Sequence, residues 1–227
     1  MKTRGKKKNV SKLFLCYYAL MYELKKEVAN TMKRLYDRKL TTATGGNVSL
    51  RYKNIMLITP SGLDKANLTP ELIAEVDIET GENKTPHLKL SIESSMHRLI
   101  YVKNPEVMAV CHSHPTKASL FSALKEEIRV DLIAESWFLL GAVKKVPYAL
   151  MGSEKLAQLI SDAAKTYCCL LLSKHGALTT GKTLLNAFDR LECLEQAAEM
   201  TLLSKGFTID PLTKEERDEI DRVYKRH

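Results

Sequence analysis

The sequence predicts an α/β fold in which helices flank a core of short strands. Apolar residues recur at helical spacing from about Ser11 to Tyr36, which indicates one long amphipathic helix. After it, short apolar runs bounded by turn residues alternate with further helical segments. A chain of 227 residues is long enough to bury one core, and no stretch has the composition of a linker. We therefore expect a single domain over residues 13–227.

The elements after the long helix follow from turn and capping signals. The runs 48–52 and 55–59 are predicted strands joined by a tight hairpin turn. Thr69 is a candidate N-cap with Pro70 at the first helical position, so a short helix should follow. A further strand is expected at 76–79, directly before another turn.

The second half of the chain alternates predicted helices with apolar strands. The expected helices are 93–100, 117–125, 154–165 and a long one capped by Thr183, and the expected strands are 107–111 and 168–174. The region between 125 and 145 matches no single pattern, so no element is predicted there.

Three histidines follow the two apolar strands of the second half. His112 and His114 stand two residues apart, and side chains two apart in an extended strand project from the same face. His175 ends the second strand, so both strands should deliver imidazole. Three imidazoles with a vacant fourth position form a ligand set of catalytic zinc. A His-x-His pair also arises by chance, and a lone histidine at a strand end is more often a surface residue, so the pattern needs further support.

A carboxylate in a helical segment supplies that support. Glu93 and His97 are four residues apart, which places both side chains on one helical face. A carboxylate beside a three-histidine ion serves either as a fourth ligand or as a general base. Both roles stay open for Glu93 on this reasoning.

Two glycine-containing turns flank the predicted hairpin. They are Thr44-Gly45-Gly46-Asn47 and Thr59-Pro60-Ser61-Gly62. Glycine lets backbone N–H groups converge on an anion, and Thr, Ser and Asn side chains add donors. Either turn alone is more simply explained as ordinary loop chemistry. Together they predict a phosphate site.

The net charge of +8 is concentrated at the N-terminus. Six positive residues precede the first acidic one: Lys2, Arg4, Lys6, Lys7, Lys8 and Lys12. The remainder of the chain is close to neutral, so residues 1–12 are expected to form a flexible basic tail. Without an aromatic platform or a recognised binding motif, this charge does not predict a nucleic-acid partner.

The five cysteines favour a reducing compartment. Their number is odd, they contain no Cys-x-x-Cys pair, and most of them lie within apolar runs. No apolar segment approaches the roughly 20 residues needed to cross a bilayer, and the N-terminus lacks the features of a signal peptide. We therefore expect a cytoplasmic protein with no membrane partner.

Taken together, these motifs resemble the class II aldolase/adducin family from roughly Val28 to Leu203. Each motif is weak alone, but their order and separations are highly specific. The family-like segments are Gly46-Asn47-Val48-Ser49, Ile58-Thr59-Pro60-Ser61-Gly62, Glu93 with His97, His112-Ser113-His114 and Lys174-His175-Gly176. The resemblance implies a three-layer α/β/α fold with a mostly antiparallel central sheet, and a homotetramer.

The resemblance also implies a role for each site residue. The implied ligands of one Zn²⁺ per subunit, or of another divalent transition metal, are His112, His114 and His175. Glu93 is the implied catalytic acid/base that also touches the ion. The implied contacts of the substrate phosphate are Gly46, Asn47, Ser61, Gly62 and Ser91. Family aldolases use a tyrosine near the C-terminus as proton donor, and Tyr224 is the only tyrosine in the last stretch of this chain.

The implied substrate is a sugar phosphate. A ketose 1-phosphate similar to fuculose or ribulose phosphate would be cleaved to dihydroxyacetone phosphate and an aldehyde through a metal-stabilised enediolate. Glutamate at position 93, where epimerases of the family resemble one another in having aspartate, favours cleavage of a carbon–carbon bond. Ile92 departs from the family's usual Ser-Ser before the glutamate, so one hydroxyl is missing from the phosphate shell.

Other members of the family remain alternatives to the aldolase. They are a sugar-phosphate 4-epimerase, a dehydratase and a decarboxylase, which differ from an aldolase in few residues. A non-catalytic adducin-like interaction module is a further alternative. The intact set of three histidines and Glu93 argues against such a module, because an interaction module has no need for metal ligands.

Overall fold

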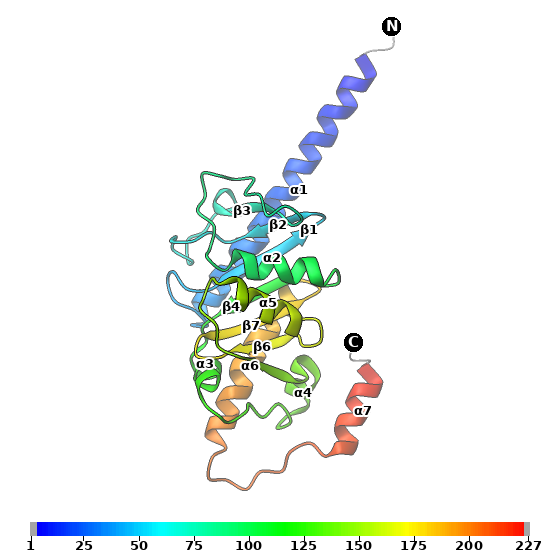
Figure 1. Ribbon diagram of the computed structural model, residues 1–227. Coiled ribbons are helices and arrows are strands. Elements are labelled where there is room, and N and C mark those ends of the chain that lie inside the picture. Colours follow the sequence, from blue (N-terminus) through cyan, green and yellow to red (C-terminus); the bar gives the residue numbers. More distant parts are fainter. Residues whose placement is uncertain (1–3, 225–227) are drawn as a thin grey trace.

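The computed structural model describes residues 4–224 and confirms the α/β fold around one central sheet (Figure 1). Seven strands lie in the order β3-β2-β1-β4-β7-β6-β5. Their bounds are β1 Asn47–Tyr52, β2 Ile55–Ile58, β3 Ala74–Asp77, β4 Ala109–Ser113, β5 Val143–Val146, β6 Cys169–Leu172 and β7 Gly176–Gly181. Every neighbouring pair is antiparallel except β5 with β6. The sheet is therefore mostly antiparallel, as predicted.

Helices cover both faces of the sheet, which gives three layers. Their bounds are α1 Arg4–Asp37, η1 Pro70–Leu72, α2 Ser94–Lys103, α3 Thr116–Ala123, α4 Ala134–Leu140, α5 Glu154–Ala163, α6 Leu184–Leu203 and α7 Lys214–Tyr224. One core joins α1, α3, α4 and α6 to the sheet, and a second core joins α2 and α5 to its opposite face. The two cores share the strands between them.

Alternation along β4 decides which layer each of its side chains enters. Ala109 and Cys111 pack into the core under α1 and α6, whereas Val110 packs into the core under α2 and α5. Because successive strand residues point to opposite faces, His112 lies on the α2 side and Ser113 on the α6 side. The N-terminus of α2 is thereby brought to the same face as His112.

The first helix is longer than its sequence pattern suggests. The apolar periodicity predicts a start at Ser11, but α1 begins at Arg4 and projects from the body of the molecule (Figure 1). Most of the expected basic tail, residues 4–12, is therefore helical, and residues 1–3 lie outside the described chain. No helix within residues 4–224 combines the length and the apolar character needed to span a membrane.

Two predictions about the second half need correction. His175 does not end a strand: β6 ends at Leu172, and His175 lies in the tight turn before β7, where its N–H donates to the Leu172 carbonyl at 2.9 Å. Strand β7 itself is absent from the sequence prediction. It is a central strand with two glycines and two threonines, so it carries little of the apolar signal that marks buried strands.

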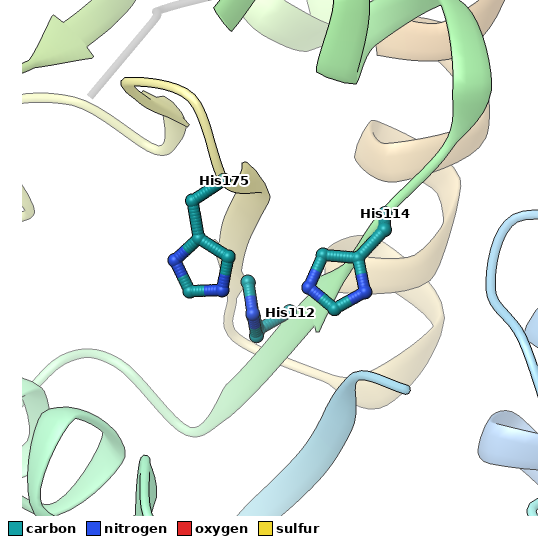
Figure 2. Close-up of side chains that lie close together, drawn as sticks. All are labelled: His112, His114 and His175. Atoms are coloured by element: carbon teal, nitrogen blue, oxygen red, sulfur yellow. The ribbon is translucent and has the colours of Figure 1, made fainter. Parts of the chain in front are cut away.

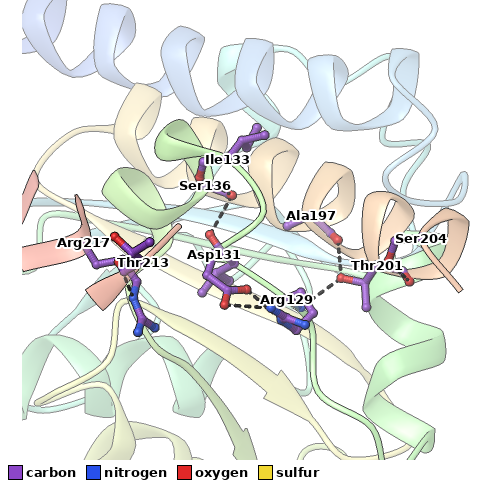
Figure 3. Close-up of polar contacts among 10 residues, drawn as sticks. Arg129, Asp131, Ile133, Ser136, Ala197, Thr201, Ser204, Thr213 and Arg217 are labelled. Carbon is purple, nitrogen blue, oxygen red and sulfur yellow. Dashed lines mark hydrogen bonds and ion pairs between the residues drawn. The ribbon is translucent and has the colours of Figure 1, made fainter. Parts of the chain in front are cut away.

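The region 125–145 consists of a loop held by polar contacts, followed by α4 and the start of β5. Arg129 Nε lies 2.7 Å from Asp131 Oδ1 and forms an ion pair with it. Figure 3 shows this pair beside helix α6. The Arg129 N–H donates to Thr201 Oγ1 at 2.9 Å, and Ser136 Oγ donates to the Ile133 carbonyl at 3.0 Å. These polar contacts replace the apolar periodicity that a sequence pattern would detect.

Candidate metal centre

Three histidine side chains meet at one edge of the sheet, as Figure 2 shows. His112 and His114 come from the end of β4, and His175 comes from the turn before β7. Their candidate ligand atoms all lie within 4.8 Å of one another. The ring centroid of His112 lies 5.0 Å from that of His114 and 4.9 Å from that of His175. The structure thus brings the three predicted ligands together.

The backbone of β7 fixes the orientation of His112. Its Nδ1 lies 2.9 Å from the Ala177 carbonyl oxygen, so Nδ1 donates a hydrogen and Nε2 faces the cluster. That Nε2 is buried and has no hydrogen-bond partner among the described residues. Gly176 lets the turn approach closely, because a Cβ there would lie 2.6 Å from His114 Cδ2. The orphaned nitrogen fits a metal ligand.

Glu93 places its carboxylate between two of the rings. Its Oε2 lies 3.2 Å from His112 Nε2, and its Oε1 lies 3.2 Å from His175 Nε2. Glu93 is the N-cap residue of α2, where the helix dipole favours a negative charge. The side-chain amide of Asn47, on β1, donates to Oε2 at 2.9 Å. A helix and a strand together hold the carboxylate at the cluster.

The electrostatics of the cluster favour an ionised Glu93. Burial opposes ionisation, but the nearby imidazoles of His112 and His175 and the hydrogen bond from Asn47 bring the pKa of Glu93 well below its ordinary value. Burial alone would lower the pKa of His112. The nearby Glu93 carboxylate has the larger effect, so the pKa of His112 is raised. Burial, followed by His112 and His175, lowers the pKa of His114 to about 4. A carboxylate beside imidazole nitrogens is a donor set that suits a divalent transition metal.

Three of the predicted phosphate contacts lie beside the cluster. Asn47 is the cross-strand partner of His112, and its Nδ2 lies 3.2 Å from Ser91 Oγ. Ser91 Oγ in turn accepts from the Glu93 N–H at 3.3 Å. Gly46 has φ +67°, and a Cβ there would lie 2.6 Å from the His112 carbonyl oxygen, so only glycine fits. Asn47 and Ser91 therefore contact the proposed acid/base directly.

The second glycine turn lies next to the first. Val48 and Thr59 bind each other, since Thr59 N donates to the Val48 carbonyl at 3.1 Å and Val48 N donates to Thr59 Oγ1 at 3.2 Å. The Ser61 N–H donates to the Lys89 carbonyl at 2.9 Å, which holds this turn against the segment before Ser91. Gly62 has φ +74°, and a Cβ added there would have no other heavy atom within 4 Å. Both turns thus reach the histidine edge of the sheet.

His97 lies behind the cluster and is not part of it. It is fully buried, and its Nδ1 lies 2.7 Å from Ser49 Oγ, which lies 2.7 Å from the Tyr101 hydroxyl. His97 therefore does not ligate a metal beside Glu93, although the two residues are four apart in the sequence. The chain of hydrogen bonds ties α2 to β1 directly beneath the carboxylate.

Tyr224 is not brought to the cluster within one chain. It ends α7, its ring lies 5.0 Å from that of Phe138, and it lines a cavity of about 780 Å³ together with Arg190. That cavity adjoins the start of β4 and the end of β7, whereas the histidines lie at the other ends of these strands. Strands of five or six residues separate the two places by on the order of 15 Å.

Lys65 is a site neighbour that the sequence does not single out. Its side chain is 1% exposed, and its ammonium lies 2.5 Å from the carbonyl oxygen of Pro60 in the second glycine turn. A lysine within a polar loop normally points to solvent. No local signal distinguishes this residue from a surface lysine, because its burial is decided by the packing of the two turns.

Comparison with known proteins agrees with the geometry. Residues 26–202 match the model of the Class II Aldolase and Adducin N-terminal domain. The chain is 32% identical over 180 residues to L-fuculose phosphate aldolase of Methanocaldococcus jannaschii. That alignment covers 79% of this chain and 96% of that enzyme. It is also 31% identical over 194 residues to 3-oxo-tetronate 4-phosphate decarboxylase of Haemophilus influenzae. That alignment covers 83% of this chain and 91% of that enzyme.

A solved structure shows the same fold. An L-fuculose 1-phosphate aldolase superposes with a TM-score of 0.80 at 31% identity, covering 90% of this chain and 97% of that one. The expected enzyme class, a metal-dependent lyase, is confirmed by these relatives. The chain belongs to the class II aldolase and adducin family.

Proposed function

We propose that this protein is a zinc-dependent aldolase that cleaves a ketose 1-phosphate to dihydroxyacetone phosphate and an aldehyde. The observation that carries the proposal is the position of Glu93, whose two carboxylate oxygens each lie 3.2 Å from a histidine nitrogen of the cluster. A buried carboxylate in that position can accept and return a proton beside the ion. The similarity to fuculose phosphate aldolases supports this reaction among those of the family.

His112, His114 and His175 are the proposed ligands of the metal. Nitrogen ligands bind Zn²⁺ at about 2.0–2.1 Å, so nitrogens that already lie within 4.8 Å of one another need only a small inward shift of the rings. Zinc in this position would supply Lewis-acid stabilisation of the negative charge that develops on the substrate when its C3–C4 bond breaks. Another divalent transition metal would supply the same chemistry.

Glu93 is the proposed acid/base. Its lowered pKa keeps the carboxylate ionised at neutral pH, and an ionised carboxylate has the free electron pair that a proton acceptor needs. The hydrogen bond from Asn47 holds Oε2 at 2.9 Å and limits rotation of the carboxylate. In the cleavage direction, the same oxygen returns a proton to the enediolate carbon to complete dihydroxyacetone phosphate.

The two glycine turns are the proposed phosphate site. The hydroxyls of Ser61 and Ser91 would donate to phosphate oxygens, Asn47 would hold Ser91 in place for this contact, and the glycines let the backbone approach. Ile92 takes the place of a further hydroxyl, and its side chain is exposed and lies against Gly152. This site would hold the substrate by its phosphate end and so orient the reacting carbons toward Glu93.

The C4 hydroxyl loses its proton as it becomes the aldehyde in cleavage, and the aldehyde oxygen gains a proton in the reverse condensation. A tyrosine that carries this proton would have to come from another chain. Tyr224 lies at the far end of β4 and β7 from its own cluster, so it can act only on the site of another subunit. We therefore propose the homotetramer together with Tyr224 as the residue that, across a subunit interface, relays this proton away in cleavage and donates it in condensation. Mixing an inactive Glu93→Gln chain with an inactive Tyr224→Phe chain tests this arrangement, because mixed assemblies should recover part of the activity.

Decarboxylation is the second candidate, and one comparison favours it. The chain is as similar to a 3-oxo-tetronate 4-phosphate decarboxylase as to several aldolases. Both reactions break a carbon–carbon bond next to a carbonyl and leave an electron pair that the metal site would stabilise. The geometry of Glu93 and the histidines serves either reaction.

A substrate screen separates the candidates. The purified, zinc-loaded protein is incubated with ketose 1-phosphates, with L-ribulose 5-phosphate and with 3-oxo-tetronate 4-phosphate. Dihydroxyacetone phosphate is measured with a coupled dehydrogenase, carbon dioxide by trapping, and epimers by chromatography. Release of dihydroxyacetone phosphate from a ketose 1-phosphate is the expected result. Carbon dioxide from the tetronate, without aldol cleavage, would assign the decarboxylase instead, and epimer formation would assign the epimerase.

A further inference from the structure

Lys65 carries a buried charge that the catalytic proposal does not use. Its side chain is 1% exposed, and no carboxylate among the side chains that the structure describes forms an ion pair with it. The neighbouring Asp64 carboxylate is directed elsewhere, since it accepts from Ala66 N at 3.0 Å and from Asn67 Nδ2 at 2.7 Å. A buried cation without a counter-ion costs several kcal/mol as an order of magnitude. A fold retains such a group only where something offsets that cost.

The contacts of Lys65 join the two glycine turns. Its ammonium lies 2.5 Å from the Pro60 carbonyl oxygen, one residue before Ser61. Its backbone N–H donates at 2.8 Å to the Ala43 carbonyl, which lies directly before the first turn, 44–47. One residue thus binds the main chain of both turns. An ammonium has three donors, and the Pro60 carbonyl takes only one of them.

We propose that Lys65 is a positioning residue of the anion site: its buried ammonium lies behind the two turns, holds them together and favours a doubly negative ligand. This inference rests on the proposed function, because it assigns a role within the same phosphate site. The offsetting interaction is then the anion itself, whose charge acts on the ammonium in a site of low dielectric. The charge of Lys65 would also compensate for the hydroxyl that the phosphate site lacks at Ile92.

Titration gives this role a signature. Burial lowers the pKa of Lys65 to about 8, so the ammonium is lost as the pH rises through that value. Other titratable groups near the turns are Asp64, next in sequence to Lys65, and His114, whose Nδ1 lies 3.1 Å from where a Cβ on Gly45 would stand. The pKa of His114 is about 4, so it does not titrate in this range. Affinity for a dianion should therefore fall above pH 8 because Lys65 loses its charge.

Inorganic sulfate is a suitable probe because it stays a dianion across the whole range. Its dissociation constant is measured by titration calorimetry for the zinc-loaded protein and for Lys65→Met at pH 7.0, 8.0, 9.0 and 9.5. We expect Lys65→Met to bind sulfate about tenfold more weakly at pH 7, and the ratio between the two proteins to approach one by pH 9.5. Any pH dependence of the metal site is common to both proteins and cancels in the ratio.

Two further variants complete the design. Lys65→Gln keeps a donor for the Pro60 carbonyl without the charge, so it should match Lys65→Met in sulfate affinity and also replaces it if that variant does not fold. Lys182→Met removes an exposed lysine at the opposite end of β7 and should bind sulfate like the parent protein.

Three outcomes would overturn the role of Lys65. They are a folded Lys65 variant that binds sulfate normally, a ratio that does not change with pH, and a parent protein with no saturable sulfate binding. Sulfate binding is read without any sugar. Failure of the aldolase assay alone would therefore leave the role of Lys65 standing, and failure of the sulfate assay alone would leave the reaction standing.

Discussion

The Nδ1 atom of His112 lies 2.9 Å from the carbonyl oxygen of Ala177. A carbonyl can only accept a hydrogen bond, so this contact fixes the hydrogen on Nδ1 and reserves the lone pair of Nε2 for the cluster. The two residues belong to neighbouring strands, β4 and β7, and the contact sets the direction of the ring. The sheet itself therefore prepares the first metal ligand.

Removal of one imidazole should abolish metal binding and activity together. His112→Ala takes away a ligand that β7 holds in place, so we expect loss of stoichiometric zinc and a fall in turnover of more than about a thousandfold, with the fold retained. Metal analysis and circular dichroism provide the measurement. His87→Ala is the matched control, because His87 is exposed and outside the cluster. Full activity in His112→Ala would refute the proposed centre.

Glu93→Gln should separate catalysis from metal binding. The amide can still accept the hydrogen bond from Asn47, but it cannot take a proton, so turnover should fall about 10²- to 10⁴-fold while zinc stays bound. Glu106→Gln, far from the cluster, controls for the loss of one negative charge. If zinc leaves together with the carboxylate, Glu93 is a ligand first and a base second.

The two glycines of β7 offer a matched pair of steric tests. In Gly176→Ala the new Cβ would lie 2.6 Å from His114 Cδ2, which should displace that ring and weaken zinc binding about 10- to 100-fold. In Gly181→Ala it would meet Ala187 N at 2.6 Å, far from the cluster, and should cost about 1–3 kcal/mol of stability without changing zinc affinity. A chelator competition and urea unfolding measure the two quantities. Equal zinc affinities in both variants would contradict the assignment of His114.

His97 should make the stability of the protein depend on pH. Burial lowers the pKa of His97 to about 3, so the unfolded chain binds a proton between pH 6.5 and 3 that the folded chain does not. The stabilisation is complete above pH 6.5 and decreases by up to about 1.4 kcal/mol per pH unit as the pH falls through this window. In His97→Gln the free energy of unfolding should change less steeply with pH, because the one proton taken up by His97 in the unfolded chain is missing. Urea unfolding at pH 5, 6 and 7 gives both slopes, and identical slopes would show that His97 does not remain neutral.

Elements with a strong local signal were predictable from the sequence. Helix α6 begins where Thr183 predicts, with the Thr183 hydroxyl accepting from Asn186 N at 3.1 Å. The hairpin of β1 and β2 forms at the expected residues, since its strands alternate around a short turn. Strand β7 and the region 125–145 were not predictable, because a central pairing position and polar contacts with α6 hold them in place.

The sequence by itself determined the chemistry of this protein: which residue types are present, in what order, and hence the α/β class, the family and the three histidines with Glu93. Only the tertiary structure decided their geometry. It placed His175 in a turn, moved His97 behind the cluster, kept Tyr224 away from its own site and buried Lys65 between the two glycine turns. The physical reason is that ligand types and local periodicity are properties of short segments. Distance, burial and pKa depend on which strands pair, and that is a property of the whole sheet.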